Sequence, residues 1–225
     1  MTPRTFRWSC AVIWPLAVAT AWAGGWSVVT VKDHPAYVIA GKPVQLTFVV
    51  RSHGQHLADG LAGFVEARSG SQLVRANAEP KEPGSYSARL LFPRAGEWQI
   101  MVDSGYSRNG GGVVRFPLTI VAEGETQPVL PAAEHGRRLF VAKGCMTCHV
   151  HTSVPSNHSS PVGPVLTGKR YPPDYLRRVL ADPTFLPGAP VETSEGPWAW
   201  KMPDLDLTPA EIEALVAFIN GDAAQ

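Results

Sequence analysis

The chain has few cysteines, few methionines and no long apolar run. Its 225 residues include three cysteines and four methionines, and Cys10 lies far from Cys145 and Cys148. A small scaffold held together by several disulfides is therefore excluded. The formal net charge is only +1, so the charge balance gives no sign of nucleic-acid binding. The longest apolar run, Cys10 to Trp22, contains Pro15 and is shorter than the roughly 20 residues of a membrane span.

Residues 1–23 have the pattern of a secretory signal peptide. Arg4 and Arg7 form a basic start, the apolar run follows, and Ala21-Trp22-Ala23 offers a small-x-small cleavage sequence. We expect cleavage after Ala23 and export to the periplasm. The alternative is that this segment is retained as an N-terminal membrane anchor.

Residues 24–122 predict an all-β domain. Six short runs are β-branched or alternate between apolar and polar residues, and glycine- or proline-containing turns separate them. These runs are Trp26–Val31, Val44–Val50, Gly63–Arg68, Tyr86–Phe92, Trp98–Val102 and Val113–Val121. About seven strands at this spacing are typical of an immunoglobulin-like sandwich. Because the segment contains no cysteine, its core must rest on apolar burial.

The sequence Cys145-Met146-Thr147-Cys148-His149 has the C-x-x-C-H pattern of covalent c-type haem attachment. Two thiols at this spacing lie on neighbouring parts of one helical turn, so each can add to a haem vinyl group. His149 then lies under the iron and supplies the proximal imidazole. We therefore predict one covalently bound haem c, attached at Cys145 and Cys148. Export agrees with this prediction, since c-type haem is attached outside the bacterial cytoplasm.

Other interpretations of the two cysteines are a thioredoxin-like redox pair, a zinc site or a disulfide. A redox pair is expected after a strand, whereas the run Glu134 to Lys143 before the motif is amphipathic and helical. A zinc site needs two more ligands, which His151 and His158 could supply on ligand type alone.

The remainder of residues 133–225 predicts three helices joined by irregular connections. The first covers about 133–143, and the second begins at Pro172-Pro173-Asp174 and ends at Asp182-Pro183. The third begins at Thr208, where Glu211 three residues later completes a capping box, and ends at Gly221. Three such helices can enclose a haem. Residues 123–132 form a short polar, proline-containing linker between the two predicted domains.

Residues 133–221 resemble the class I cytochrome c domains. The resemblance rests on the C-x-x-C-H motif, on Gly163-Pro164-Val165-Leu166, and on Lys201-Met202-Pro203-Asp204 before the final helix. It implies His149 and Met202 as the two axial iron ligands. It also implies that the Pro164 carbonyl accepts a hydrogen bond from His149 and fixes its tautomer.

The same resemblance implies a contact between the first and the last helix. Gly136 and Phe140 correspond to positions that pack on Leu215 and Phe218. The stretch from Phe185 to Trp200 is longer than in the shortest members and rich in proline and tryptophan, so its path is not predicted. Met202 is also the only methionine after the haem motif. His151 and His158 are the competing candidates for the sixth ligand.

Residues 26–121 are similar to the YtkA-like or FixH-like periplasmic domains, on the turn phrases Ala40-Gly41-Lys42-Pro43, Pro83-Gly84-Ser85-Tyr86 and Phe92 to Trp98. Some members are associated with oxidase assembly or copper handling. That association suggests a copper site at His53 and His56, with His34 as third ligand. The alternative, which we favour, is that these histidines are solvated loop residues, because soft ligands such as cysteine are missing.

These patterns predict two domains, an all-β immunoglobulin-like sandwich (24–122) followed by an all-α cytochrome c fold (133–225). The leading hypothesis is a mono-haem electron carrier, not an enzyme, in which the sandwich is a docking module. Redox partner proteins are implied but not identified, and association with a membrane respiratory complex is compatible with this role. Two alternatives are an oxidase-assembly or copper-handling protein with a haem electron source, and a haem enzyme or sensor with a labile sixth ligand.

Overall fold

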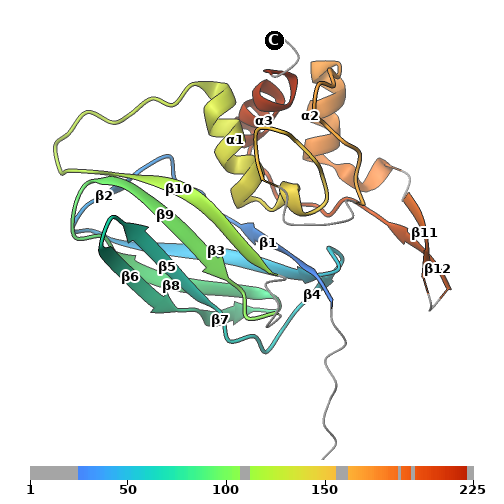
Figure 1. Ribbon diagram of the computed structural model, residues 1–225. Helices are drawn as coiled ribbons and strands as arrows, with labels where there is room; N and C mark the ends of the chain where they lie inside the picture. The colour runs from blue at the N-terminus through green and yellow to red at the C-terminus, as the bar shows by residue number, and fades with distance from the viewer. Residues whose placement is uncertain (1–24, 107–111, 156–161, 187–188, 194–195, 222–225) are drawn as a thin grey trace, which may run out of the picture.

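The N-terminal half of the chain is a sandwich of two five-stranded sheets (Figure 1). The computed structural model describes residues 25–106, 112–155, 162–186, 189–193 and 196–221. The first sheet has the order β1 (Ser27–Val31), β3 (Pro43–Ser52), β8 (Ser85–Leu91) and β7 (Glu79–Glu82), and β4 (His56–Leu57) also pairs with β3. The second has the order β2 (Val38–Ile39), β10 (Val113–Val121), β9 (Gly96–Asp103), β5 (Phe64–Ser69) and β6 (Gln72–Asn77).

Alternating burial along the strands forms the core of this sandwich. In β9, Trp98, Ile100 and Val102 are fully buried, whereas Gln99 between them is exposed. This is the period of two that places successive side chains on opposite faces of a sheet. Burial of one such large apolar side chain stabilises the fold by about 1.5–3 kcal/mol. Apolar packing therefore holds the sandwich together, as the absence of cysteine requires.

All six predicted strand runs correspond to strands in the structure, as β1, β3, β5, β8, β9 and β10. The sequence analysis missed β2, β4, β6 and β7. Strand β7 is polar and exposed, whereas β6 alternates exposed residues with the only partly buried Val74 and Ala76. Each of the two lies at one end of its sheet. Edge strands of this kind lack the buried apolar face from which a strand is predicted.

The C-terminal part contains the three predicted helices, α1 (Ala132–Ala142), α2 (Pro173–Ala181) and α3 (Pro209–Gly221), and two short 3-10 helices, η1 (Cys145–Thr147) and η2 (Pro183–Phe185). It also contains an antiparallel hairpin, β11 (Ala189–Thr193) and β12 (Gly196–Trp200). The expectation of an all-α fold is therefore only approximately correct. The hairpin occupies the stretch whose path the sequence did not predict.

Helices α1 and α3 cross at Gly136. A Cβ atom at this position would lie 1.9 Å from the Ala214 carbonyl oxygen and 2.7 Å from the Phe218 Cβ. One turn further along α1, the rings of Phe140 and Phe218 pack with centroids 5.4 Å apart. The predicted packing of Gly136 and Phe140 on the last helix is thus present, and only glycine permits so close an approach.

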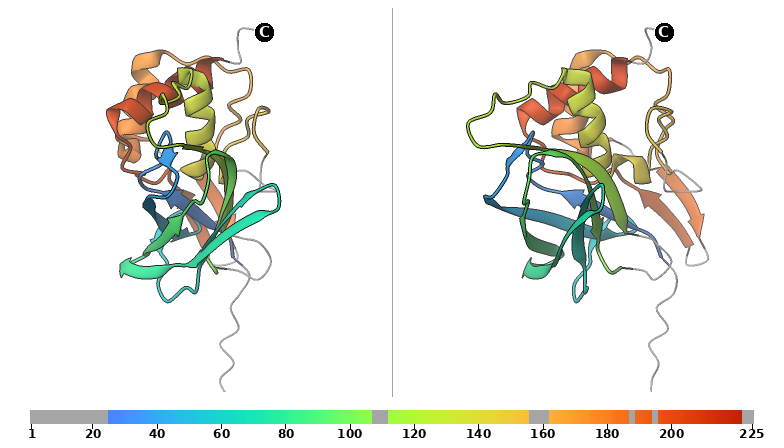
Figure 2. Two further views of the ribbon diagram at one scale, coloured as in Figure 1. Left: turned by 90° about the vertical axis from the view of Figure 1, so that its left-hand side faces the viewer. Right: turned by 60° about the vertical axis from the view of Figure 1, so that its left-hand side comes forward.

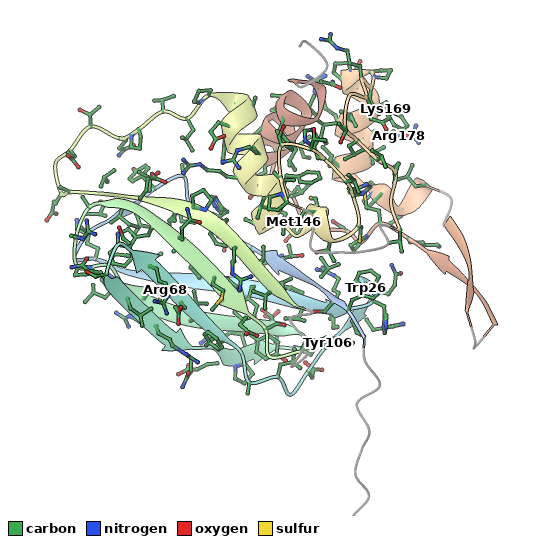
Figure 3. All side chains as sticks on the ribbon, in the orientation of Figure 1. Trp26, Arg68, Tyr106, Met146, Lys169 and Arg178 are labelled. Atoms are coloured by element: carbon green, nitrogen blue, oxygen red, sulfur yellow. The ribbon has the colours of Figure 1, made fainter. Side chains whose placement is uncertain are left out.

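The helices group on one side of the sandwich (Figure 2). One continuous hydrophobic cluster includes Val29 and Val31 of β1 as well as Leu139 and Phe140 of α1. The side chain of Met146, which is almost completely buried, lies at the end of α1 where the two parts meet (Figure 3). The sandwich and the helical part therefore share an apolar interface.

The predicted signal peptide and His158 lie outside the described residues. Among the helices that the structure describes, none has the length and apolar character needed to cross a membrane.

Candidate haem-binding site

One cavity in the C-terminal part brings together the four predicted site residues Cys145, Cys148, His149 and Met202. Its empty volume is about 1200 Å³, the open mouth included. Most of the other lining side chains are apolar and come from α1, α2, α3 and the connections between them; they include Phe140, Leu166, Leu176, Val179, Leu215 and Ile219. Such a mostly apolar cavity with few polar groups is typical of a cofactor site.

The end of α1 shapes the C-x-x-C-H motif. Gly144 follows the helix with a φ of 80°, a left-handed conformation that glycine adopts without strain. The chain then forms η1, in which the Cys148 and His149 amides donate to the Cys145 carbonyl at 3.1 and 2.9 Å. This single turn directs Cys145, Cys148 and His149 to the same cavity.

Both cysteines are free thiols. Burial raises the pKa of Cys145 to about 12 and that of Cys148 to about 11. Thiols with so high a pKa stay protonated at neutral pH, whereas a redox-active cysteine acts as a thiolate. The structure therefore does not favour the redox-pair interpretation.

Two consecutive residues hold the His149 ring. Its Nδ1 lies 3.0 Å from the Pro164 carbonyl oxygen, so Nδ1–H donates and Nε2 keeps a free lone pair. A Cβ on Gly163 would lie 2.5 Å from the His149 Cε1, which leaves room only for glycine. Burial lowers the pKa of His149 and favours the neutral imidazole, the form that ligates metals.

Met202 enters the cavity from a segment without regular secondary structure, residues 201–207. The side chain is half-buried against the hydrophobic cluster. It comes from a different part of the chain than His149, and both side chains line the same cavity. Two thiols, one imidazole and one thioether in an apolar cavity fit the requirements of a covalently attached haem with two axial ligands.

Of the two competing ligands, His158 lies outside the described residues, and His151 is not placed in this way. His151 is buried, and its ring packs on Phe218 with centroids 4.2 Å apart; it is not among the residues that line the cavity. Among the described residues, no group of three or more His, Cys, Asp or Glu side chains is arranged to hold a metal ion. The suggested copper site at His34, His53 and His56 therefore has no geometric support in this part of the chain. The expectation of solvated loop histidines is wrong for His34, which is buried.

A buried ion pair lies next to the site, and the sequence analysis did not identify it. The Lys143 ammonium, which is fully buried, lies 2.7 Å from the Glu211 carboxylate and donates to the Lys32 carbonyl at 2.5 Å. Glu211 also accepts from the Thr208 amide at 2.9 Å, as the predicted capping box requires. The pair thus joins the end of α1, the start of α3 and the end of β1.

The sandwich also reaches the site directly. Val28 of β1 is one of the residues that line the cavity. A Cβ on Gly144 would lie 2.6 Å from the Val29 carbonyl oxygen, so the backbone of β1 lies directly against the residue before the haem motif. No sequence pattern predicted these contacts, because they join segments more than 100 residues apart.

Comparison with known proteins finds a family match for the C-terminal part. Residues 133–221 match the family model for cytochrome c. The match covers the C-x-x-C-H motif, Met202 and all three helices, and it supports a c-type cytochrome domain here. The comparison with curated proteins found no match.

Solved structures with some likeness to the chain include the filamin domain of Lin-41, with 14% identity over 44% of this chain and 98% of that one, at a TM-score of 0.36. The Escherichia coli adhesin FdeC is 22% identical over 44% of this chain and 32% of that one, at a TM-score of 0.34. The two-sheet arrangement of the sandwich is defined by its own strand order.

Proposed function

We propose that the chain is a periplasmic c-type cytochrome with one haem that transfers single electrons. The observation that supports it is the cavity that Cys145, Cys148, His149 and Met202 line together, within the region that matches cytochrome c. Each thiol would add across one vinyl group of the haem, its sulfur to one carbon and its hydrogen to the other. The addition loses no atom and requires no oxidant.

When bound, haem supplies one-electron chemistry at its iron. In this proposal His149 and Met202 would both bind the iron, which would leave no position open for a substrate. Pro164 holds the His149 ring by accepting its Nδ1–H, which fixes the tautomer and increases the basicity of Nε2. The apolar lining keeps water away, and a thioether ligand raises the reduction potential. These features favour an electron carrier over a haem enzyme or sensor.

The remaining elements of the proposal concern organisation and location. Residues 1–23 would export the chain or, if retained, anchor it, and residues 24–122 and 133–225 would be its two domains. The relation of the sandwich to the YtkA-like or FixH-like domains is supported by its turn phrases alone. The redox partners would be other proteins, and association with a membrane respiratory complex would suit an exported cytochrome.

Replacement of Met202 tests the proposal. Oxidised wild type should show the weak far-red charge-transfer band of sulfur-ligated iron, and the reduced protein should bind carbon monoxide slowly. Met202→Ala should lose the band, have a lower reduction potential and bind carbon monoxide rapidly, because the sixth position is then open. Met101→Ala, which removes a methionine from β9 in the sandwich, is the matched control and should behave like wild type.

Two outcomes would contradict the assignment. A wild-type spectrum typical of two imidazoles, unchanged in Met202→Ala and altered in His158→Ala, would identify His158 as the ligand. Rapid carbon monoxide binding by the wild type would instead favour an enzyme or sensor.

A further inference from the structure

The segment that carries Met202 receives its hydrogen bonds from the sandwich. Among the described residues, no backbone–backbone hydrogen bond involves residues 201–207. Within the segment, the Asp206 amide donates to the Asp204 carboxylate at 2.9 Å. A loop with so few internal hydrogen bonds is expected to open easily unless other parts of the protein hold it.

Three side chains of the sandwich hold this segment on both sides of Met202. The Gln55 side-chain amide donates to the Lys201 carbonyl at 2.6 Å, and the Arg51 guanidinium donates to the Asp204 carbonyl at 3.0 Å. The Lys32 ammonium forms an ion pair with Asp206 at 2.6 Å. Two of the three contacts go to backbone carbonyls, so they act on the path of the chain and not on a side chain that could swing away.

The three donors lie in or directly next to paired strands of one sheet. Arg51 is in β3, and the backbone pairs Val28 with Arg51 in the register of β1 and β3. Lys32 follows β1 directly, and Gln55 is in the turn after β3, where its amide donates to the Ser52 carbonyl at 3.0 Å. The spacing between the three donors is therefore set by the strand pairing of the sheet.

The same sheet also holds the segment before the haem motif. Thr30 of β1, which is fully buried, donates from its hydroxyl to the Lys143 carbonyl at 3.3 Å. Arg51 reaches this hydroxyl with its other nitrogen at 3.5 Å. One surface of the sandwich thus contacts both segments that carry the predicted iron ligands. It contacts the His149 segment at Lys143, two residues before Cys145, and the other segment on either side of Met202.

We propose that Arg51 and Gln55 are positioning residues for Met202, and that the sandwich holds the sulfur of Met202 at the sixth position of the haem iron. The sandwich then has a role within the chain, beyond that of a docking module for other proteins. This inference rests on the proposed function, because it requires Met202 to be the ligand. It predicts that loosening the sandwich contacts exposes the sixth position although none of the four haem-binding side chains is substituted.

The test uses the full-length haem-loaded protein with Arg51→Met and Gln55→Glu, alone and together. Glutamate has nearly the size of glutamine but as a carboxylate cannot donate to the Lys201 carbonyl. The matched control is the pair Arg89→Met and Gln45→Glu, which are exposed neighbours on β8 and β3 of the same sheet. Three properties are measured: hydrogen exchange of the Asp206 amide, which donates to Asp204 within the segment, the far-red band, and the rate of carbon monoxide binding.

We expect the Arg51→Met/Gln55→Glu variant to exchange the Asp206 amide about tenfold faster, because two hydrogen bonds that oppose opening of the segment are lost. Its far-red band should weaken and its carbon monoxide binding should accelerate, whereas the control variant should match wild type in all three measurements. The single variants Arg51→Met and Gln55→Glu should give values between those of wild type and the double variant. They therefore still test the proposal if the double variant folds poorly.

Other outcomes separate the inference from the function. If wild type shows the far-red band and the double variant matches it in exchange and in carbon monoxide binding, the positioning role is wrong and the electron-transfer proposal stands. If wild type lacks the band, the proposed ligation fails, and the positioning role fails with it.

Discussion

Substituting Gly136 with alanine should destabilise the cytochrome domain, because this residue sets the distance between α1 and α3. The added Cβ would lie 1.9 Å from the Ala214 carbonyl oxygen and 2.6 Å from its carbon. Carbon–oxygen contacts in proteins are normally about 3.3 Å or longer. The clashing atoms belong to the helix backbone, so the helices must move apart by an ångström or more, and this would loosen the contact between Phe140 and Phe218.

The expected magnitude is the balance of two terms. Alanine is favoured over glycine in a helix by about 1 kcal/mol, while overpacking a tight contact costs about 1–3 kcal/mol and occasionally more. Because the Cβ meets backbone on the facing helix, we expect the upper end of this cost, and so a net loss of about 2 kcal/mol. For a chain of this length that corresponds to a fall in Tm of roughly 4–8 °C.

Thermal unfolding of the full-length holoprotein, followed by circular dichroism, measures this loss. The matched control is Gly221→Ala at the end of α3, where the new Cβ would meet only the Ala133 Cβ at an ordinary 3.9 Å. The control should be neutral or slightly stabilising. If Gly136→Ala unfolds within about 0.5 kcal/mol of wild type, the range of an ordinary surface substitution, the helices do not require glycine at their crossing and the packing argument is wrong.

Two further predictions concern buried charged and polar groups. Lys143→Met should destabilise the protein by about 3–5 kcal/mol in urea unfolding, since it leaves the Glu211 carboxylate without its buried partner. The double variant Lys143→Met/Glu211→Gln should recover part of this loss. A double variant as unstable as the single variant would contradict the pairing. His34 should make stability depend on pH, because burial and the nearby His135, Lys143 and Arg138 lower its pKa from 6.5 to about 4. Between these values the unfolded state binds the proton and the folded state does not, so stability should fall by up to about 3 kcal/mol as the pH falls from 6.5 to 4. His34→Leu should flatten that dependence, and parallel curves for the two proteins would refute it.

Local sequence patterns were sufficient to predict the parts of the molecule that short-range interactions determine. The C-x-x-C-H spacing brought Cys145, Cys148 and His149 to one side of a single turn, and the Thr208–Glu211 capping box formed as expected, with hydrogen bonds of 2.9 and 3.3 Å. The main strands followed from alternating burial in the same way. In each case, the residues that interact are close in the sequence or share a regular period, so the pattern itself carries the information.

Other features were decided only by the tertiary structure. The exposed strands β6 and β7 form because neighbouring strands offer hydrogen-bonding edges, and their own side chains carry little signal. Gln55 and Lys32 contact partners 146 and 174 residues away, and each is an ordinary polar residue with no motif around it. A polar side chain of the sandwich can hold the Met202 segment only when the two domains, which are far apart in the sequence, pack against each other. The residues that we propose as haem-binding could therefore be picked out from the sequence, whereas the contacts that hold Met202 emerge only where the sandwich packs against the cytochrome domain.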